Sequence, residues 1–135
     1  FAGHSPDGSA RMFTTPGDAG FFQFAWPEWV DHGYWSWVTG EANTLGMAQF
    51  GEYHAARYCA DLVAHGKSDW YLPAPYEMDV LRHHAPAIGG FDMEATYWTG
   101  TEWGDNLAMY HRMSDGFHGY TSKGIAMRIR CVRKD

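Results

Sequence analysis

The two cysteines of the chain, Cys59 and Cys131, constrain its fold more than any other feature. Cys59 lies in a mid-chain stretch with a helical pattern, and Cys131 lies in the last strand-like run, near the C-terminus. If they bond, the closed loop takes in more than half of the chain, and restriction of the unfolded state stabilises the fold by about 4 kcal/mol. Such a bond persists outside the reducing cytosol. The pair therefore favours an exported recognition domain over a metabolic enzyme.

The composition favours one domain with short strands and many turns. A chain of 135 residues can bury one sizeable core, so we expect a single domain over residues 1–135. Aromatic residues make up 17% of the chain and glycines number 16, which indicates turns rather than long helices. No apolar run approaches the roughly 18 residues of a membrane-spanning helix, so we expect no membrane insertion. Export is inferred from the cysteines alone.

The net charge of −6 is unevenly distributed along the chain. Residues 1–106 are strongly acidic, whereas residues 107–135 carry an excess of Lys and Arg. The acidic body argues against nucleic-acid binding, which needs a continuous basic surface. The basic C-terminal part is either a contact for an anionic glycan or an acidic partner, or it offsets the acidic body within the fold. We favour the second interpretation.

The N-terminal third alternates turn-rich and aromatic stretches. Turn residues surround a strand predicted at 11–14. Residues 21–38, named the aromatic segment below, contain Phe21, Phe22, Phe24, Trp26, Trp29, Tyr34, Trp35 and Trp37. Alternation of large and smaller side chains predicts a strand at 34–38, and residues 40–46 are expected to form a loop.

Two helices are predicted in the middle of the chain. Residues 51–65 present an apolar face that includes Cys59, and Gly66 suits a left-handed cap after it. Residues 75–84 form the second helix, because Pro75 suits a first turn and Glu77 suits the positive end of the helix dipole.

The C-terminal part has the pattern of an antiparallel meander. Strands are predicted at 97–102, 107–113 and 125–131. In the last of these, Ile125, Met127, Ile129 and Cys131 share one face, while Arg128 and Arg130 point the other way. Short strands, two helices and then a meander predict an α+β fold.

The sequence offers no motif for a metal site or a catalytic centre. Among the eight histidines, the adjacent His83 and His84 diverge on a helix, and no His-Glu-x-x-His or paired Cys-x-x-Cys occurs. Acidic turns around Asp92 and Asp105 lack the pattern of a calcium loop. Nucleophilic catalysis has no Gly-x-Ser-x-Gly turn. We therefore expect no metal, no cofactor and no enzymatic activity.

An aromatic and polar stretch, residues 103–120, is the candidate binding region. Sugar- and protein-binding surfaces combine Trp and Tyr rings with Asn, Asp and Arg hydrogen-bonding groups. Alternation places Tyr110 and Arg112 opposite Met109 and Met113, which favours their exposure. Core or turn packing of these rings is the alternative for any one residue. The candidate ligand-binding residues are Trp103, Asp105, Asn106, Tyr110, Arg112, His118 and Tyr120.

An ordered set of motifs resembles one known family. It includes Asp69-Trp70-Tyr71-Leu72-Pro73, then Tyr97-Trp98-Thr99-Gly100-Thr101-Glu102, and finally Arg128-Ile129-Arg130-Cys131-Val132-Arg133. Together with markers upstream, from Met12 onward, these motifs resemble the C-terminal domain family of the Legionella collagen-like adhesin. The resemblance extends from residue 12 to residue 133.

The resemblance implies a C-type-lectin-like fold, with two helices packed on a twisted antiparallel sheet and long loops. In that fold a disulfide commonly joins the first helix to the last strand, which agrees with a Cys59–Cys131 bond. It also implies that Trp70, Trp98 and Glu102 belong to the framework. Relatives are adhesins that bind host glycans, including sulfated ones, often as trimers, and similar folds form the receptor-binding tips of phage tails.

Three departures from the family pattern affect these expectations. Ala74 stands where the family often has a helix-capping Ser, a loss of about 1 kcal/mol if nothing else caps the helix. The aromatic segment 21–38 has no match to the family, so it is interpreted as an insertion or a docking surface. The acidic body also weakens the case for a sulfated ligand.

The leading hypothesis is a non-enzymatic, extracellular recognition or adhesion domain, on a cell surface or a virion. It would bind a glycan or a cell-surface protein through residues 103–120. The first alternative is a structural or assembly domain of a filament, phage tail or capsid, whose partners are a homotrimer's other copies or filament or tail subunits. The second is an enzyme, because formylglycine-generating enzymes share this broad fold.

Overall fold

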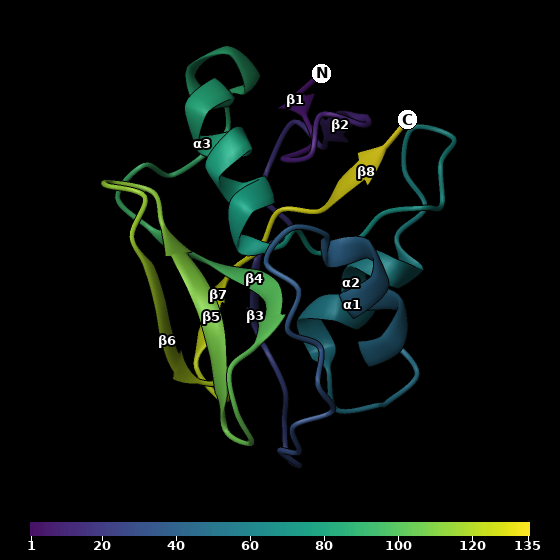
Figure 1. The fold of residues 1–135 in the computed structure, drawn as a ribbon, viewed down its shortest axis with the longest axis vertical. Helices are drawn as coiled ribbons and strands as arrows, with labels where there is room; N and C mark the ends of the chain where they lie inside the picture. The colour runs from purple at the N-terminus through teal and green to yellow at the C-terminus, as the bar shows by residue number, and fades with distance from the viewer.

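The computed structural model describes residues 1–135 and contains three helices and eight strands in two sheets (Figure 1). The helices are α1 (Gly40–Met47), α2 (His54–Asp61) and α3 (Pro75–Ile88). The strands are β1 (Gly3–His4), β2 (Arg11–Thr14), β3 (Phe21–Gln23), β4 (Thr96–Glu102), β5 (Leu107–Arg112), β6 (His118–Ser122), β7 (Ala126–Arg128) and β8 (Val132–Lys134). The α+β prediction is confirmed.

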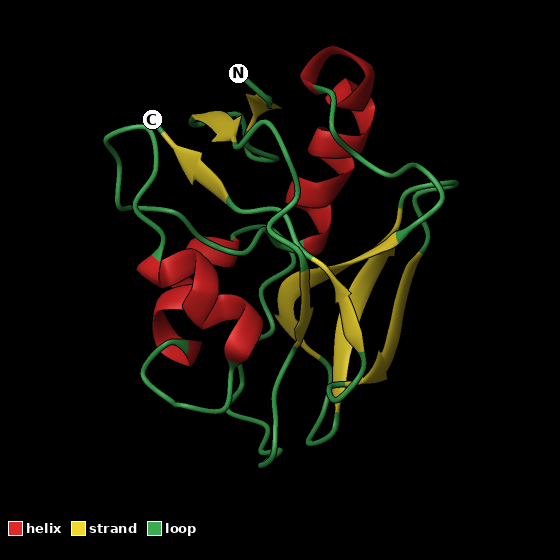
Figure 2. Ribbon diagram, turned by 180° about the vertical axis from the view of Figure 1, so that it is seen from behind, coloured by secondary structure: helices red, strands yellow, loops and turns green.

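The larger sheet has the order β3-β7-β4-β5-β6, and the smaller has the order β1-β2-β8. All pairings are antiparallel except that of β4 with β7. Figure 2 shows α1 and α2 together on one side, the larger sheet on the other, and both termini near the smaller sheet. The two ends of the chain thus meet, since β2 pairs with β8.

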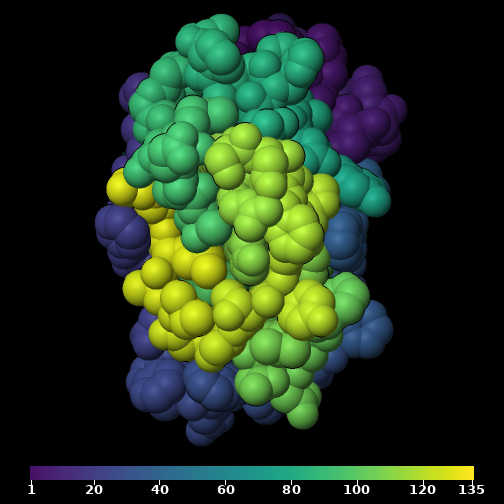
Figure 3. Space-filling model, turned by 90° about the vertical axis from the view of Figure 1, so that its left-hand side faces the viewer, coloured from purple at the N-terminus to yellow at the C-terminus, as the bar shows by residue number.

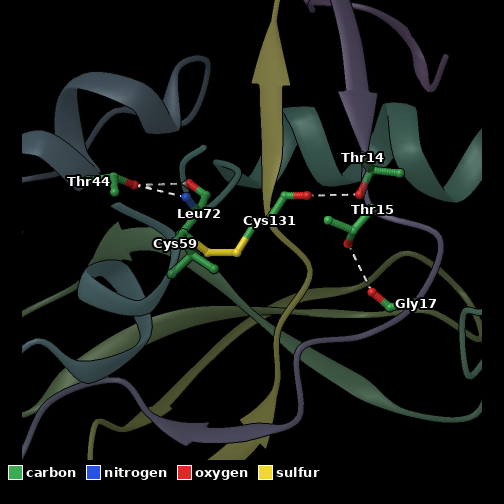
Figure 4. The surroundings of a disulfide bond; sticks show 7 residues. All are labelled: Thr14, Thr15, Gly17, Thr44, Cys59, Leu72 and Cys131. Carbon is green, nitrogen blue, oxygen red and sulfur yellow. Dashed lines mark hydrogen bonds between the residues drawn. A yellow bond between two sulfur atoms is a disulfide. The ribbon is translucent and has the colours of Figure 1, made fainter. Parts of the chain in front are cut away.

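The disulfide expected between Cys59 and Cys131 is present (Figure 4). It joins α2 to the residue just before β8, across a sequence separation of 72, with the Cα atoms 5.5 Å apart. Both cysteines are buried in a core cluster that also contains Trp70 and Trp98. Thr14 secures the same segment, because its hydroxyl donates to the Cys131 carbonyl at 2.8 Å.

The first helix was expected to be a loop, and this expectation is wrong. Residues 40–47 form α1, although its only strong local signal is Glu41 in the first turn. Packing decides the structure: Gly40 lies so close to Leu72 that an added Cβ would sit 2.1 Å from the Leu72 carbonyl oxygen. Asn43, Thr44 and Met47 are buried beneath it. Residues 34–38, predicted as a strand, belong to no strand and pass beside α1 as a loop.

The other two helices differ from prediction in their limits. The helix predicted at 51–65 is shorter, because Leu62 is extended and ends α2 at Asp61. Gly66 lies instead in a tight turn between the bridged residues Ala64 and Lys67. The second predicted helix is longer, since α3 continues past His84 to Ile88 and ends at Gly89, whose φ is 78°.

The last predicted strand is divided between the two sheets. β7 pairs with β3 and β4 in the larger sheet, and β8 pairs with β2 in the smaller one. Ile129 and Cys131 are buried as predicted, but Ile125 is exposed. Arg130, expected to point away from the core, is fully buried. Asp18 explains this, because its carboxylate lies 2.9 Å from the guanidinium and provides the paired anion that a buried cation needs.

The missing Ser cap before α3 is replaced by Glu77. Ala74 is the N-cap residue and has no side-chain acceptor, but the Glu77 carboxylate accepts its backbone N–H at 3.0 Å. The same carboxylate accepts the N–H of Gly40 at 2.7 Å and the Tyr71 hydroxyl at 2.6 Å. One buried carboxylate therefore holds the N-termini of both α1 and α3, where helix dipoles favour negative charge.

Candidate functional site

The candidate residues of the 103–120 region lie on two opposite faces of the larger sheet. In the β5–β6 pair, His111 is opposite His118 and Met109 is opposite Tyr120, so these four share a face. Tyr110 is opposite Gly119 and Trp98, and it lies on the other face, as does Arg112. The structure therefore does not gather the predicted residues into one patch.

Tyr110 and Arg112 are engaged by their neighbours rather than free. Tyr110 covers Gly119 so closely that an added Cβ there would lie 2.5 Å from the phenol oxygen. Arg112 donates two hydrogen bonds to Asp115, at 2.9 and 2.6 Å, and its guanidinium lies 4.8 Å from the centre of the Phe117 ring. Both side chains are half-buried, so the exposure expected of them is only partly met, whereas Met109 and Met113 on the opposite face are buried.

Trp103 and Tyr120 form an exposed aromatic pair on the face of His118. Their rings stack with centroids 5.0 Å apart and an angle of 12° between planes, and about half of each residue is exposed. Two further candidates, Asp105 and Asn106, lie in the same β4–β5 loop and are exposed. Asp105 accepts the backbone N–H of Asp31 at 3.3 Å, which joins this loop to the aromatic segment.

Beside Trp103 the aromatic segment completes a hollow of about 310 Å³, named the tryptophan hollow. Its walls are Trp35, Trp37, Trp103 and Glu102. Trp35 is 56% exposed, and its indole N–H donates to Asp31 at 2.9 Å, so the ring is held in place while one face stays open. The sequence analysis missed Trp35 and Trp37 as site residues, although the density of aromatic residues at 21–38 was the signal that could have found them.

Glu102 anchors the aromatic segment to the sheet. One carboxylate oxygen lies near the backbone N–H groups of His32 and Tyr34, at 3.2 and 3.3 Å. The other accepts the Tyr53 hydroxyl at 2.6 Å and the Lys123 ammonium at 2.7 Å. Burial, together with this carboxylate, raises the pKa of Tyr53 above its ordinary value, so the phenol remains a donor. Glu102 is thus a buried structural group, as are Trp70 and Trp98.

The basic C-terminal part offsets the acidic body inside the fold, as favoured from the sequence. Every Lys and Arg between residues 107 and 135 lies within 4.0 Å of a carboxylate. The pairs are Arg112 with Asp115, Lys123 with Glu102, Arg128 with Asp18 and Asp92, Arg130 with Asp18, Arg133 with Asp69, and Lys134 with Glu77. These cations form no free basic surface.

His118, the remaining candidate, lies at the α3 side of the same face. Its Nε2 atom is 2.9 Å from a carboxylate oxygen of Asp79 on α3. Its ring is edge-on to Trp37, with centroids 5.6 Å apart, so it contacts one wall residue of the tryptophan hollow without lining the hollow itself. The structure places Trp103, His118 and Tyr120 on this face, with Asp105 and Asn106 in the loop that carries Trp103, and it separates Tyr110 and Arg112 from them.

Comparison with known proteins identifies the family. A search of curated proteins finds no match to the chain. No helix of the fold is long and apolar enough to cross a membrane, and the Cys59–Cys131 disulfide fits an exported protein. The model of the Lcl C-terminal domain matches residues 23–133, which include most of the aromatic segment, the sheet and the disulfide. The chain therefore belongs to the Lcl C-terminal domain family, a family of adhesin-type extracellular domains.

Proposed function

We propose that this domain is a non-enzymatic adhesin module that binds an uncharged glycan in the tryptophan hollow. The observation that carries the proposal is the exposure of Trp35 and Trp103 around one hollow, next to the stacked Tyr120. Rigid aromatic rings bury the apolar face of a sugar with little loss of side-chain entropy. Polar groups at the rim fix the orientation of a ligand in such a pocket.

Charge favours an uncharged glycan over a sulfated one. The chain carries a net charge of −6, and the exposed polar groups beside Trp103 include Asp105, while Asp31 holds Trp35. The C-terminal cations that could meet a sulfate are paired with carboxylates. A sulfated ligand would be repelled at low salt before it made contact. The acidic rim instead offers acceptors for sugar hydroxyl groups.

A glycan array with the intact, oxidised domain tests the proposal. We expect wild type to bind uncharged glycans, and Trp35→Ala and Trp103→Ala to weaken binding at least tenfold while unfolding at the wild-type temperature. Tyr110→Ala and Arg112→Ala are the matched controls, because they remove an aromatic ring and a cation from the opposite face of the sheet. Equal binding by wild type and both tryptophan variants would place the site elsewhere, as would loss of binding in the controls alone.

The second candidate is an assembly function, in which the partner is another copy of this chain. It is favoured by three exposed apolar side chains of the aromatic segment outside the hollow, Phe21, Trp26 and Val30. Light scattering at increasing protein concentration tests it. A trimer that dissociates in Trp26→Ser would support assembly, and a monomer at all concentrations would exclude it.

If the ligand is instead a cell-surface protein, the glycan array would show no binding while the domain still binds intact cells.

A further inference from the structure

Three potential metal ligands from three different elements meet beside the hollow. Asp79 comes from the middle of α3, His111 from β5 and His118 from β6. The two histidines are directly opposite in the β5–β6 ladder, so their rings point to the same face, and α3 lies across that face. Figure 3 shows this hairpin at the molecular surface, with the green and teal residues of α3 and the loop after it above. No sequence motif predicts this cluster, because its members are far apart in the chain.

The distances suit one small cation. The His118 Nε2 atom is 2.9 Å from Asp79 Oδ1, and the His111 Nδ1 atom is 3.6 Å from the same oxygen. The three ligand atoms all lie within 4.8 Å of one another. Ligands about 2.0–2.1 Å from a tetrahedral zinc ion are separated by about 3.4 Å from each other. To bind such an ion, the 2.9 Å contact between His118 and Asp79 opens by about 0.5 Å, and the other ligand separations close toward about 3.4 Å. These small side-chain adjustments provide three of the four ligands of a tetrahedral shell.

His111 provides a second, independent observation. Its side chain is fully buried, and neither ring nitrogen has a hydrogen-bond partner in the fold. A buried polar group without a partner costs about 1–3 kcal/mol, so such groups are rare without a ligand or other explanation. The nearby Arg82 does not satisfy the ring, because its Nε–H donates to the Met113 carbonyl oxygen at 2.8 Å.

We propose that Asp79, His111 and His118 form a site for a divalent transition metal, with Zn²⁺ as the expected ion. Two imidazoles and one carboxylate match zinc and its neighbours in the first transition series, whereas Ca²⁺ and Mg²⁺ prefer oxygen ligands. The fourth position faces solvent, since the Asp79 side chain is 44% exposed. The ion would fasten α3 to the β5–β6 hairpin. The proposal differs from the expectation of no metal drawn from the sequence, and it does not depend on the proposed glycan function.

Titration of chelator-treated protein, with its disulfide intact, tests the proposal. We expect one Co²⁺ per chain with the visible absorption of a tetrahedral site, displacement by Zn²⁺, and a rise of several degrees in Tm at saturating Zn²⁺. Asp79→Asn and His118→Gln should each weaken Zn²⁺ binding at least tenfold and abolish the rise in Tm. His83→Gln is the matched control, because it removes an exposed histidine from the same helix.

His111 needs a separate measurement, because replacing a buried ring risks unfolding the domain. In ¹⁵N-labelled wild type, Zn²⁺ should shift the Nδ1 resonance of His111 and the Nε2 resonance of His118. Zinc affinity equal to wild type in both Asp79→Asn and His118→Gln would overturn the proposal. So would a Tm that Zn²⁺ leaves unchanged in wild type, or binding that His83→Gln removes.

Discussion

Lys123 and Glu102 form an ion pair in which both side chains are fully buried, with 2.7 Å between Nζ and Oε2. Lys123 also lies 5.9 Å from the centre of the Phe24 ring and 5.6 Å from that of Tyr53, so aromatic faces surround the ammonium. Because Glu102 also binds the backbone of His32 and Tyr34, this pair fixes the base of the tryptophan hollow. The pair thus links the stability of the core to the shape of the candidate site.

The two members of this ion pair should be strongly coupled in their effect on stability. Lys123→Met leaves a buried carboxylate without its cation, and we expect a loss of about 3–5 kcal/mol in the free energy of unfolding. The double variant Glu102→Gln/Lys123→Met should lose less than the sum of the single variants. Urea unfolding of all four proteins measures the coupling. Lys67→Met, at an exposed lysine, is the control and should stay within about 0.5 kcal/mol of wild type.

Loss of the disulfide should lower the free energy of unfolding while the domain still folds. The bond closes a sequence separation of 72, so Cys59→Ala/Cys131→Ala should lower the free energy of unfolding by about 4 kcal/mol. Alanine is chosen because both positions are buried among apolar groups, where a serine hydroxyl would lack a partner. Denaturant unfolding with and without reductant gives the same comparison on wild type. A reduced protein as stable as the oxidised one would contradict the entropic argument.

Local patterns predicted strands and helices where side-chain periodicity coincides with packing. The strand at β5 was predicted because its alternation matches the two faces of the sheet, and Met109 and Met113 are buried. The failures share one cause, which is contact with residues distant in the chain. α1 forms because Gly40 fits against Leu72 and is held by Glu77, and the final strand divides because β2 competes for its second half. The periodicity of a single sequence gives no information about either contact.

The candidate site was predictable only in part for the same reason. Aromatic content identified Trp103 and Tyr120, and both are exposed. The alternation along β5 placed Tyr110 opposite Met109 correctly, but Tyr110 is half-buried, and sheet pairing places it on the face opposite Tyr120. Trp35 reaches the hollow because Glu102 binds the backbone of Tyr34 beside it, across a sequence separation of 68. Sequence spacing alone cannot indicate that relationship.

Glu77 should stabilise the N-termini of α1 and α3 together, so its replacement should destabilise both helices. Its carboxylate accepts the N–H groups of Gly40 and Ala74, and it accepts the Tyr71 hydroxyl. We expect Glu77→Gln to cost about 1–3 kcal/mol, because an amide group cannot accept all three hydrogen bonds. Amide hydrogen exchange at Gly40 and Ala74 should accelerate together.

Glu41→Gln is the matched control for this prediction, since Glu41 lies in the first turn of α1 but is exposed. It removes a similar interaction with the helix dipole and leaves the buried hydrogen bonds intact. We expect its effect on unfolding to stay below about 1 kcal/mol. Accelerated exchange at Ala74 in Glu41→Gln would contradict the assignment of that amide to Glu77.

Acid should destabilise the metal-free domain through His111. Burial holds the pKa of this imidazole at about 4 in the folded state, below its ordinary value of 6.5. The unfolded state therefore binds a proton that the folded state does not, and stability present above pH 6.5 is lost as the pH falls from 6.5 to 4. The full loss is about 3 kcal/mol. Urea unfolding in the presence of a chelator measures this loss.

The variant His111→Gln should flatten the pH dependence of stability between pH 4 and pH 6.5, even if it lowers stability at pH 7. The control His83→Gln should leave the pH dependence unchanged. A wild-type stability that is constant from pH 7 to pH 4 would show that the ring takes up its proton in the folded state, with Asp79, 3.6 Å away, as its counterion.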